Sequence, residues 1–340
     1  MLAAETELQR AEKVKNYLLQ HKLLHPDYLL VKEMGLIYFP LVKKTKVPGA
    51  KVVETTFSFP TRKKTPSFVE LLKHKLNKEE LELIPKSQEI VGKILILEIP
   101  PKLEKKEKII AEAYLKAHRN IETVVKKERM HEGIFRTRKV KILAGKLTKE
   151  TIHLESGVQL KLHLEKTYFS ARLGHERLRI VHQIKKGEEV LVMFSGAGPY
   201  PLVLARNSSA KKIIGVEVNP WAHYYGQQNV MLNKLEQKVT LIHGDVREVL
   251  PDLKYKFDRI VMPLPKTGEE FLDVALPKIK VGGVVHLYAF LKEEEIKAYG
   301  EKVKLICSRL KHPIKILRTA LCGQFSPRTF RVCFDIKVLK

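Results

Sequence analysis

A short glycine turn after an apolar run is the first feature that could do chemistry. Gly196 and Gly198 follow the run Val190–Met193, and glycine lets the backbone approach a ligand closely. A helix that begins here presents its unpaired N–H groups to that ligand. A dinucleotide fold has a third small residue three positions after the second glycine, where this chain has Tyr200 and Pro201. We therefore disfavour NAD and FAD, and a P-loop is excluded because no Gly-Lys-Ser/Thr follows.

Two acids follow the turn, each near the end of a later strand-like run. Glu217 lies about 20 residues after the glycines, where an acid can accept hydrogen bonds from both hydroxyls of a ribose. Asp245 follows the next run, and a carboxylate there can accept a hydrogen bond from the exocyclic amine of adenine. Taken singly, each feature is weak, since a Gly-x-Gly pair is more often a tight turn than a ligand site. Together they predict an adenosine ligand without a pyrophosphate, as in the S-adenosylmethionine site of doubly wound methyltransferases.

A proline-rich loop follows the fourth strand-like run. Arg259–Met262 is followed by Pro263, Leu264 and Pro265. In an open α/β sheet, the carboxyl end of such a strand faces the crevice where ligands bind. The two prolines fix the backbone there, which suits a rigid site wall, although a simple strand terminator is the alternative interpretation.

The elements that must position these residues alternate as strand and helix from about residue 165. Helix-like segments separate the strand-like runs, which is typical of βαβ units on a parallel sheet. The last two runs are instead joined by a short loop, which predicts an antiparallel edge. The strand-like runs are Val190–Met193, Lys212–Val218, Val239–His243, Arg259–Met262, Val284–Phe290, Lys315–Leu321 and Phe330–Val338.

The chain before residue 165 has shorter and more varied elements. We expect a helix over Glu5–Gln20, a charged, proline-flanked linker over 60–66, and a helix opened by a capping box of Ser67 and Glu70. Alternating apolar residues predict a hairpin around 156–157. These patterns divide the chain into residues 1–62, 67–164 and 165–340.

The charge of the chain indicates a polyanionic partner. Lys and Arg number 63 against 38 Asp and Glu, a formal net charge of +25. Nucleic acid and an anionic membrane surface are both compatible with this excess, and solvated lysine-rich faces are the alternative. No apolar stretch approaches the ~20 residues of a membrane span. The three cysteines have no CxxC spacing, so we expect no metal site and a reducing, cytoplasmic compartment.

Several segments resemble one known family. Tyr168–Arg177 reads YFSARLGHER and resembles the YFSPRL-x-x-ER signature of the tRNA (guanine-37-N1)-methyltransferases of the archaeal and eukaryotic type. FRTR at 135–138 and LAG at 143–145 resemble that family's FR-x-R and LAG segments. The MF-x-G-x-GP turn, the NP after Glu217, the GDVRE run and the x-LP loop also match. The resemblance covers nearly the whole chain and is strongest from about 130 to 290.

The resemblance implies methyl transfer from S-adenosylmethionine to N1 of guanine 37 in tRNA, next to the anticodon. It implies a doubly wound, Rossmann-like class I methyltransferase domain with a mixed seven-stranded sheet at 165–340. Two small α+β domains would precede it: 1–62 to bind the outer corner of the tRNA, and 67–164 as a middle RNA-binding domain. The anticodon stem-loop and outer corner of tRNA would be the partner of a monomer, and a membrane would not.

The resemblance also assigns roles to residues. Glu176 matches the family's general base for the guanine N1 proton, and Arg136 matches the arginine that stabilises charge on guanine O6. Pro263 and Pro265 form the loop at the reacting base, and the tRNA contacts are Arg136, Arg138, Arg172 and Arg177. The implied cofactor contacts are Tyr168, Arg172, Phe194, Gly196, Gly198, Pro199, Glu217, Val218, Asn219, Asp245, Val246 and Met262.

Two departures from the family keep alternatives open. Val192 stands where the family has an acid, and Pro263 stands where it has an asparagine. Proline offers neither a side-chain hydrogen bond nor an N–H, so backbone carbonyls of 262–264 would have to accept from the guanine. A sister family transfers the aminocarboxypropyl group in wyosine synthesis, but its Gly-Tyr-Phe differs from the Gly-Pro-Tyr at 198–200. A bifunctional wyosine-pathway methyltransferase and a non-catalytic tRNA-binding relative also remain possible.

Overall fold

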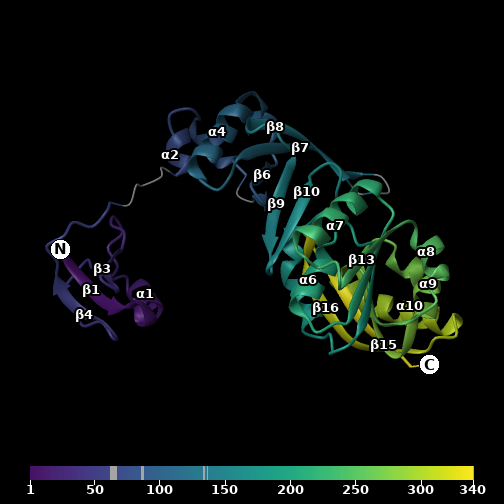
Figure 1. The fold of residues 1–340 in the computed structure, drawn as a ribbon. Coiled ribbons are helices and arrows are strands. Elements are labelled where there is room, and N and C mark those ends of the chain that lie inside the picture. Colours follow the sequence, from purple (N-terminus) through teal and green to yellow (C-terminus); the bar gives the residue numbers. More distant parts are fainter. Residues whose placement is uncertain (62–66, 86–87, 133–134, 136, 340) are drawn as a thin grey trace. The chain divides into compact units, whose positions relative to one another are not determined.

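The computed structural model describes residues 1–61, 67–85, 88–132, 135 and 137–339 (Figure 1). They form two compact units, Met1–Leu71 and Leu72–Lys340. Most of the expected linker, residues 62–66, lies outside the described residues. The division into three functional domains therefore stays a prediction.

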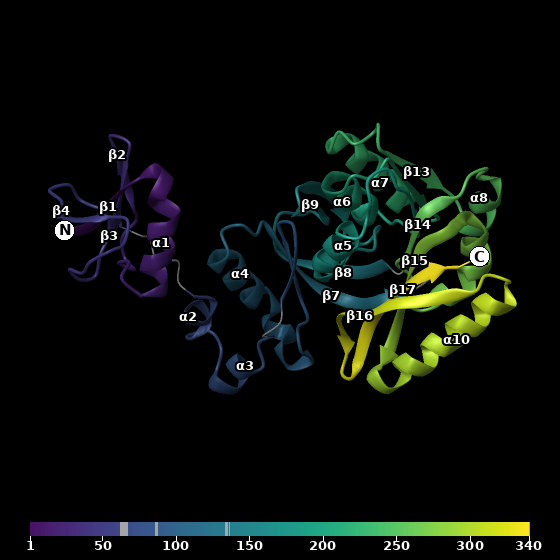
Figure 2. The same cartoon turned by 90° about the horizontal axis from the view of Figure 1, so that it is seen from below.

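The first unit contains a four-stranded antiparallel sheet, drawn together with helix α1 (Ala11–Gln20) in Figure 2. The expected helix over Glu5–Gln20 is wrong at its start, because β1 (Leu2–Glu7) is a central strand hydrogen-bonded to two neighbours. Pairing on both sides outweighs the helical preference of the glutamates in β1. Helix α1 follows and packs its buried Val14 and Leu18 into this unit's core. The sheet order is β2 (Val31–Glu33), β3 (Leu36–Pro40), β1, β4 (Lys51–Glu54).

A second four-stranded sheet opens the larger unit. The capping box before it is confirmed, since Ser67 N–H donates to Glu70 and Glu70 N–H donates to Ser67 at the start of α2 (Phe68–Leu72). A short helix α3 (Lys78–Glu82) follows, and α4 (Glu107–Ala117) packs on the sheet. The strand order is β5 (Glu89–Val91), β6 (Ile94–Leu97), β7 (Thr123–Glu132), β8 (Thr137–Gly145).

The expected hairpin is confirmed as β9 (Glu150–Glu155) and β10 (Val158–His163). Two asparagines of α7 (Pro220–Leu232) and its C-cap cover the outer edge of β10. Asn229 accepts from Lys161 N–H, and Asn233 accepts from Gln159 N–H. These side chains satisfy backbone groups that an open edge strand would leave unpaired.

The expected mixed seven-stranded sheet is confirmed. Its order is β13-β12-β11-β14-β15-β17-β16, with the first five strands parallel and β17 antiparallel to β15 and β16. Parallel pairing brings the carboxyl ends of β11 to β14 to one edge, where ligands bind in such sheets. The strands are β11 (Glu189–Met193), β12 (Lys212–Glu217), β13 (Val239–His243), β14 (Phe257–Met262), β15 (Ile279–Lys292), β16 (Ile314–Ser326) and β17 (Thr329–Val338).

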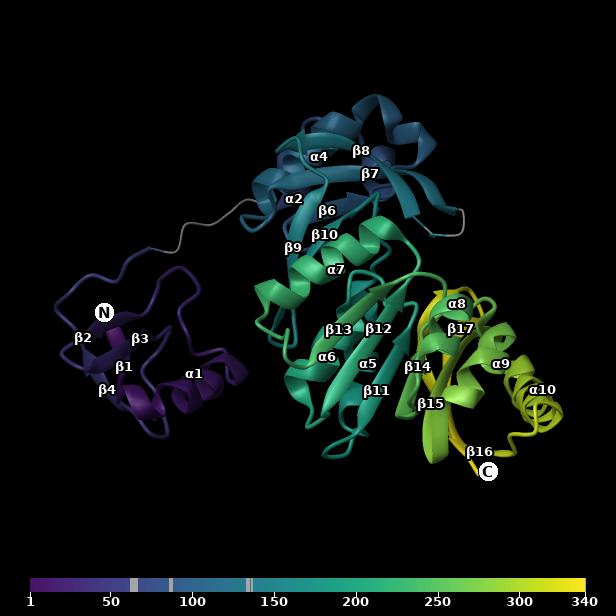
Figure 3. The same cartoon turned by 45° about the vertical axis from the view of Figure 1, so that its right-hand side comes forward.

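Helices cover both faces of this sheet (Figure 3). The buried side chains of β11 alternate, so that Val190 and Val192 face one core and Leu191 and Met193 face the other. The first core contains α5 (Gly174–Val181), α6 (Pro199–Asn207) and α7. The second contains α8 (Val246–Asp252), α9 (Leu272–Ala275) and α10 (Ile296–Arg309). Among the described residues, no helix has the length and apolar character to cross a membrane.

Candidate functional site

A cavity of about 920 Å³ opens at the carboxyl ends of β11 to β14. Pockets for drug-sized ligands occupy roughly 300–1,000 Å³, so the cavity has room for a nucleoside and part of a second molecule. Glu89 of β5, Lys127 of β7 and Glu98, which directly follows β6, also line it. The expected site residues on its wall are Tyr168, Arg172, Phe194, Gly196, Glu217, Val218, Asn219, Asp245, Val246 and Pro263.

The glycine turn is built by left-handed backbone at three positions. Phe194, Gly196 and Gly198 have φ angles of 58°, 57° and 86°, and Ser195 N–H donates to the Val216 carbonyl of the next strand. Gly196 lies on the cavity wall. Gly198 instead precedes α6 away from the wall, and a Cβ there would lie 3.1 Å from Leu202. Only the first glycine therefore exposes its backbone to a ligand.

Glu217, the last residue of β12, links the end of that strand to the glycine turn after β11. Its Oε2 accepts from Gly196 N–H at 2.7 Å, and its Oε1 accepts from Asn219 N–H at 2.8 Å. Burial raises the pKa of Glu217, and these two backbone hydrogen bonds oppose that effect. Each carboxylate oxygen has a second lone pair. The side chain is thus held rigidly and can still accept hydrogen bonds from a ligand.

Asp245 and Asn219 each cap the helix that follows them. Asp245 Oδ1 accepts from Arg247 N–H at 2.8 Å at the start of α8. Asn219 accepts from two N–H groups of α7 and donates to the Lys166 carbonyl. Asn219 thereby anchors the segment that leads to Tyr168. We expect Asp245 to contact a ligand and Asn219 mainly to position the wall.

The other expected cofactor residues differ in whether they line the cavity. Val218 and Val246 line the cavity, whereas Pro199 and Met262 are buried away from its wall. Phe271 also lines it and packs edge-on against Phe194, with their centroids 4.9 Å apart. Phe271 lies far along the chain in a segment without a motif, so no sequence signal indicated it.

The proline loop stands at the wall but uses some of its backbone acceptors internally. Leu264 N–H donates to the Met262 carbonyl at 2.8 Å, and Phe290 N–H donates to the Pro265 carbonyl at 2.9 Å. Pro263 and Leu264 line the cavity, and Pro265 does not. The carbonyls of Pro263 and Leu264 are therefore the better candidates for accepting from a base.

The expected tRNA-binding arginines divide into two groups. Arg172 lines the cavity. Arg138 is buried in a bidentate pair with Glu89, and Arg177 is buried in a bidentate pair with Glu155. Each buried arginine also donates to a backbone carbonyl of the YFSARL segment. Both therefore hold this segment in place and do not reach the wall, while Arg136 lies outside the described residues.

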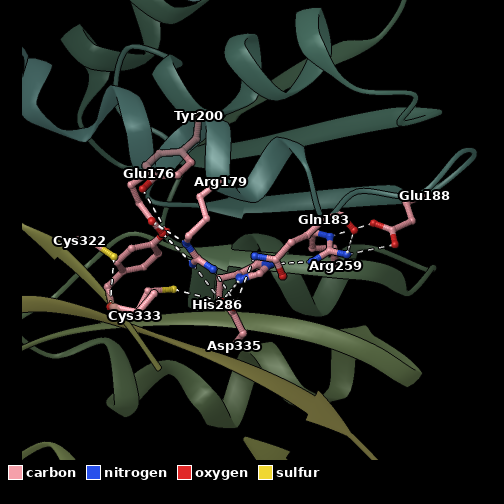
Figure 4. A network of polar contacts seen from close by, with 12 residues as sticks. Glu176, Arg179, Gln183, Glu188, Tyr200, Arg259, His286, Cys322, Cys333 and Asp335 are labelled. Carbon is pink, nitrogen blue, oxygen red and sulfur yellow. Dashed lines mark hydrogen bonds and ion pairs between the residues drawn. The ribbon is translucent and has the colours of Figure 1, made fainter. Parts of the chain in front are cut away.

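Glu176 does not line the cavity and lies in a buried polar network (Figure 4). Both of its carboxylate oxygens accept from Arg179, and Oε1 also accepts from the Tyr288 hydroxyl. Arg179 is shared with the buried Asp335. The Tyr200 hydroxyl donates to the Tyr288 hydroxyl at 3.2 Å. The family resemblance placed Glu176 at the reacting base, whereas in the structure neither Glu176 nor its partners Arg179 and Tyr288 line the cavity.

His286 extends this network to a second arginine. Its Nε2 lies 2.7 Å from Arg259, which has only protons to donate, and its Nδ1 lies 2.7 Å from Asp335. The histidine is therefore neutral, with its proton on Nδ1. Burial lowers the pKa of His286, and Asp335 opposes this only in part. Burial raises the pKa of Asp335, but hydrogen bonds from His286 and Arg179 outweigh it, so the pKa lies below its ordinary value. The candidate ligand atoms of Cys333, His286 and Asp335 lie within 4.8 Å of one another, as a metal site would require. However, Arg259 already donates to His286 Nε2 and Arg179 to the Asp335 carboxylate.

This network predicts a loss of stability in mild acid. Unfolded histidine takes up a proton below about pH 6.5, whereas the folded His286 stays neutral. The free energy of unfolding should therefore fall, by up to roughly 1.4 kcal/mol per pH unit below that value. Thermal denaturation between pH 8 and pH 5 measures this slope, which should be smaller in His286→Asn. His175→Asn, at an exposed position on α5, is the control. Equal slopes in all three proteins would contradict a neutral buried His286.

Comparison with known proteins places the chain among tRNA-modifying enzymes. Residues 151–316 match the model of the TRM5/TYW2 methyltransferase domain, and 68–148 match the TYW2 N-terminal domain. The chain is 34% identical to tRNA (guanine(37)-N(1))-methyltransferase Trm5b of Pyrococcus abyssi over 99% of each chain. It is also 30% identical to tRNA(Phe) (4-demethylwyosine(37)-C(7)) aminocarboxypropyltransferase of Pyrococcus horikoshii, over 81% of this chain and 97% of that one.

Solved structures agree with the sequence matches. A complex of aTrm5 and tRNALeu superposes with a TM-score of 0.71 at 30% identity and covers all of both chains. Methanocaldococcus jannaschii Trm5 in complex with adenosine superposes with a TM-score of 0.65 at 29% identity, again over all of both chains.

Proposed function

The chain belongs to the TRM5/TYW2 methyltransferase family, and on that premise we propose that it methylates N1 of guanine 37 in tRNA, with S-adenosylmethionine as donor. The observation that carries the proposal is the meeting of Gly196, Glu217 and Asp245 on one cavity wall. An adenosine needs acceptors for its ribose hydroxyls and its exocyclic amine, and the two acids are placed to supply them. A solved relative binds adenosine, which supports this half of the site.

The residues present fit S-adenosylmethionine, which contains an adenosine but no pyrophosphate. S-adenosylmethionine, when bound, supplies a methyl group on a positively charged sulfur. Glu217 would hold the ribose and Asp245 the adenine. Phe194 and Phe271 form an apolar wall beside them. These side chains orient the donor and exclude water from the site.

The cavity is also suited to an RNA base. Arg172 and Lys266 line it, and such cations attract phosphates. Methylation at N1 replaces the proton on that nitrogen, so the reaction needs a base. We propose Glu176 for this role and Arg136 for stabilising charge on O6. Glu176 does not line the cavity, so contact with a guanine requires the carboxylate or the base to move from the position seen here; Oε2, which accepts only from Arg179, has a lone pair left for the guanine N1–H.

The remaining parts of the proposal concern the whole molecule. We assign residues 1–62 to the outer corner of the tRNA, 67–164 to a middle RNA-binding domain and 165–340 to methyl transfer by a monomer. A net charge of +25 supports extensive phosphate contacts. Three free thiols support a reducing, cytoplasmic compartment.

A wyosine-pathway activity is the second candidate, because aminocarboxypropyltransferases of that pathway are also similar to the chain. The two activities use different carbons of the same donor. A tRNA transcript with G37 should therefore be incubated with donor labelled either in the methyl group or in the aminocarboxypropyl chain, and then digested. We expect methyl label in 1-methylguanosine and none in a transcript with A37.

Other outcomes of the same assay separate the alternatives. Label from the aminocarboxypropyl chain in RNA would replace the proposal with the sister activity. Retention of tRNA without transfer of either label would indicate a non-catalytic relative. A tRNA carrying 4-demethylwyosine, offered as a second substrate, tests whether a second methylation occurs.

A further inference from the structure

Two stacked phenylalanines form part of the cavity wall. The rings of Phe290 and Phe325 lie 3.9 Å apart with an interplanar angle of 26°. Both line the cavity, and Phe325 is 52% exposed. A large exposed aromatic ring that is held by a second ring offers a flat, rigid surface. Neither residue belongs to a motif that sequence analysis had singled out.

The sheet places these rings beside the proline loop. Phe290 is in β15, where its N–H donates to the Pro265 carbonyl. Phe325 is near the end of the edge strand β16, whose register with β17 shifts on both sides of Gln324. Gly323, with a φ of 116°, lies within this irregular stretch. Such bulges re-aim side chains next to active sites, and here they turn Phe325 onto Phe290.

Arg331 adds a positive charge to the same surface. It pairs with Phe290 across β15 and β17, and its guanidinium lies 5.1 Å from the Phe290 ring centroid. It donates to the Tyr168 hydroxyl at 3.2 Å. Its Nε is buried without a hydrogen-bond partner, and the ion pairs found among the described residues include none with Arg331. This arginine therefore keeps its charge available to an anion in the cavity.

We propose that Phe290, Phe325 and Arg331 form a stacking subsite for a nucleobase that flanks the methylated guanine, with Arg331 on its phosphate. The inference rests on the proposed function and adds a specific contact to it. Base stacking on aromatic rings and phosphate pairing with arginine are two of the interactions by which proteins hold single-stranded RNA. Because Phe325 is half exposed at the end of its strand, its free face suits a neighbour of the base that enters the cavity.

The test uses RNA binding as well as methyl transfer. An anticodon stem-loop RNA carries the fluorescent base 2-aminopurine at position 36 or at position 38, on either side of G37. Stacking quenches this fluorescence, so the wild-type protein should quench at least one probe. Phe325→Ala should abolish most of the quenching and weaken RNA binding about tenfold. Phe325→Trp should retain both, and Leu321→Ala, exposed on the same strand but away from the cavity, should change neither.

The role of Arg331 is tested by the salt dependence of RNA binding and by the affinity for S-adenosylmethionine. Arg331→Gln should reduce the slope of log affinity for the RNA against log salt concentration by about 0.7, the value for one single-strand phosphate. The affinity for S-adenosylmethionine should change less than twofold. An equal loss for donor and RNA would instead place Arg331 on the donor and overturn its part in the subsite.

Two further outcomes separate this inference from the proposed function. If the wild-type protein methylates G37 but quenches neither probe, or if Phe325→Ala quenches like the wild type, the subsite is wrong and the function stands. If the wild-type protein quenches a probe in a Phe325-dependent way but methylates nothing, the subsite stands and the proposed function is wrong.

Discussion

Glu217→Ala is expected to weaken S-adenosylmethionine binding by a factor of about one hundred or more. The carboxylate would accept two hydroxyls of the ribose, and hydrogen bonds to charged groups contribute about 1.5–3 kcal/mol each. The substitution also releases the N–H groups of Gly196 and Asn219, which now donate to it. Equilibrium dialysis or calorimetry with the donor measures the loss directly.

Two variants separate ligand binding from the geometry of the loop. Glu217→Gln keeps the size of the side chain and one carbonyl acceptor, so we expect an intermediate loss. Glu248→Gln removes a carboxylate that is exposed on α8 and away from the cavity, and it should leave donor affinity unchanged. If Glu217→Ala binds the donor within threefold of the wild type, Glu217 does not hold the ribose.

Glu176→Gln is expected to slow methyl transfer by about 10²–10⁴-fold, the usual contribution of a general base. The amide has the shape of the carboxylate but cannot take the N1 proton at neutral pH. Its oxygen can still accept from Tyr288 or Arg179, so most of the network should persist. Single-turnover rates at saturating tRNA and donor measure the chemical step, and we expect affinities for both ligands within about threefold of the wild type.

The competing explanation for Glu176 is structural, since the residue lies in a buried ion pair with Arg179. Asp335→Asn alters the other carboxylate held by Arg179 and serves as the matched control. It should lower the melting temperature while transfer at saturation stays within about tenfold of the wild type. If Glu176→Gln lowers the melting temperature like Asp335→Asn and transfers methyl groups at the wild-type rate, Glu176 is not the base.

Most of the larger fold could be predicted because its signals are local. Apolar runs bounded by turn residues indicated the strands of the seven-stranded sheet, and alternation with helical segments indicated that five are parallel. The segment Glu5–Glu7 could not be predicted in this way. It is a strand only because β3, more than 25 residues away, pairs with all three residues and β4 pairs with Glu5 on the other side.

The residues expected to bind S-adenosylmethionine could similarly be predicted from the sequence. Glu217 ends a strand and Gly196 and Asp245 each lie shortly after one, and parallel strands bring such positions to one edge. The RNA half was visible only in part. Phe290, Phe325 and Arg331 lie in strands without a motif, and their meeting depends on the pairing of β15, β16 and β17.

The sequence by itself predicted an adenosine ligand, because the residue types and spacing of the glycine turn and the two acids suit one, and its resemblance to a known family indicated methyl transfer. The tertiary structure decided which charges remain available for it. Arg138 and Arg177 are neutralised by Glu89 and Glu155, which stand 49 and 22 residues away, whereas Arg172 and Arg331 line the cavity. The charge of an arginine is neutralised by a carboxylate that the fold brings within hydrogen-bonding distance. Contacts between residues so far apart in the chain cannot be read from the local sequence pattern.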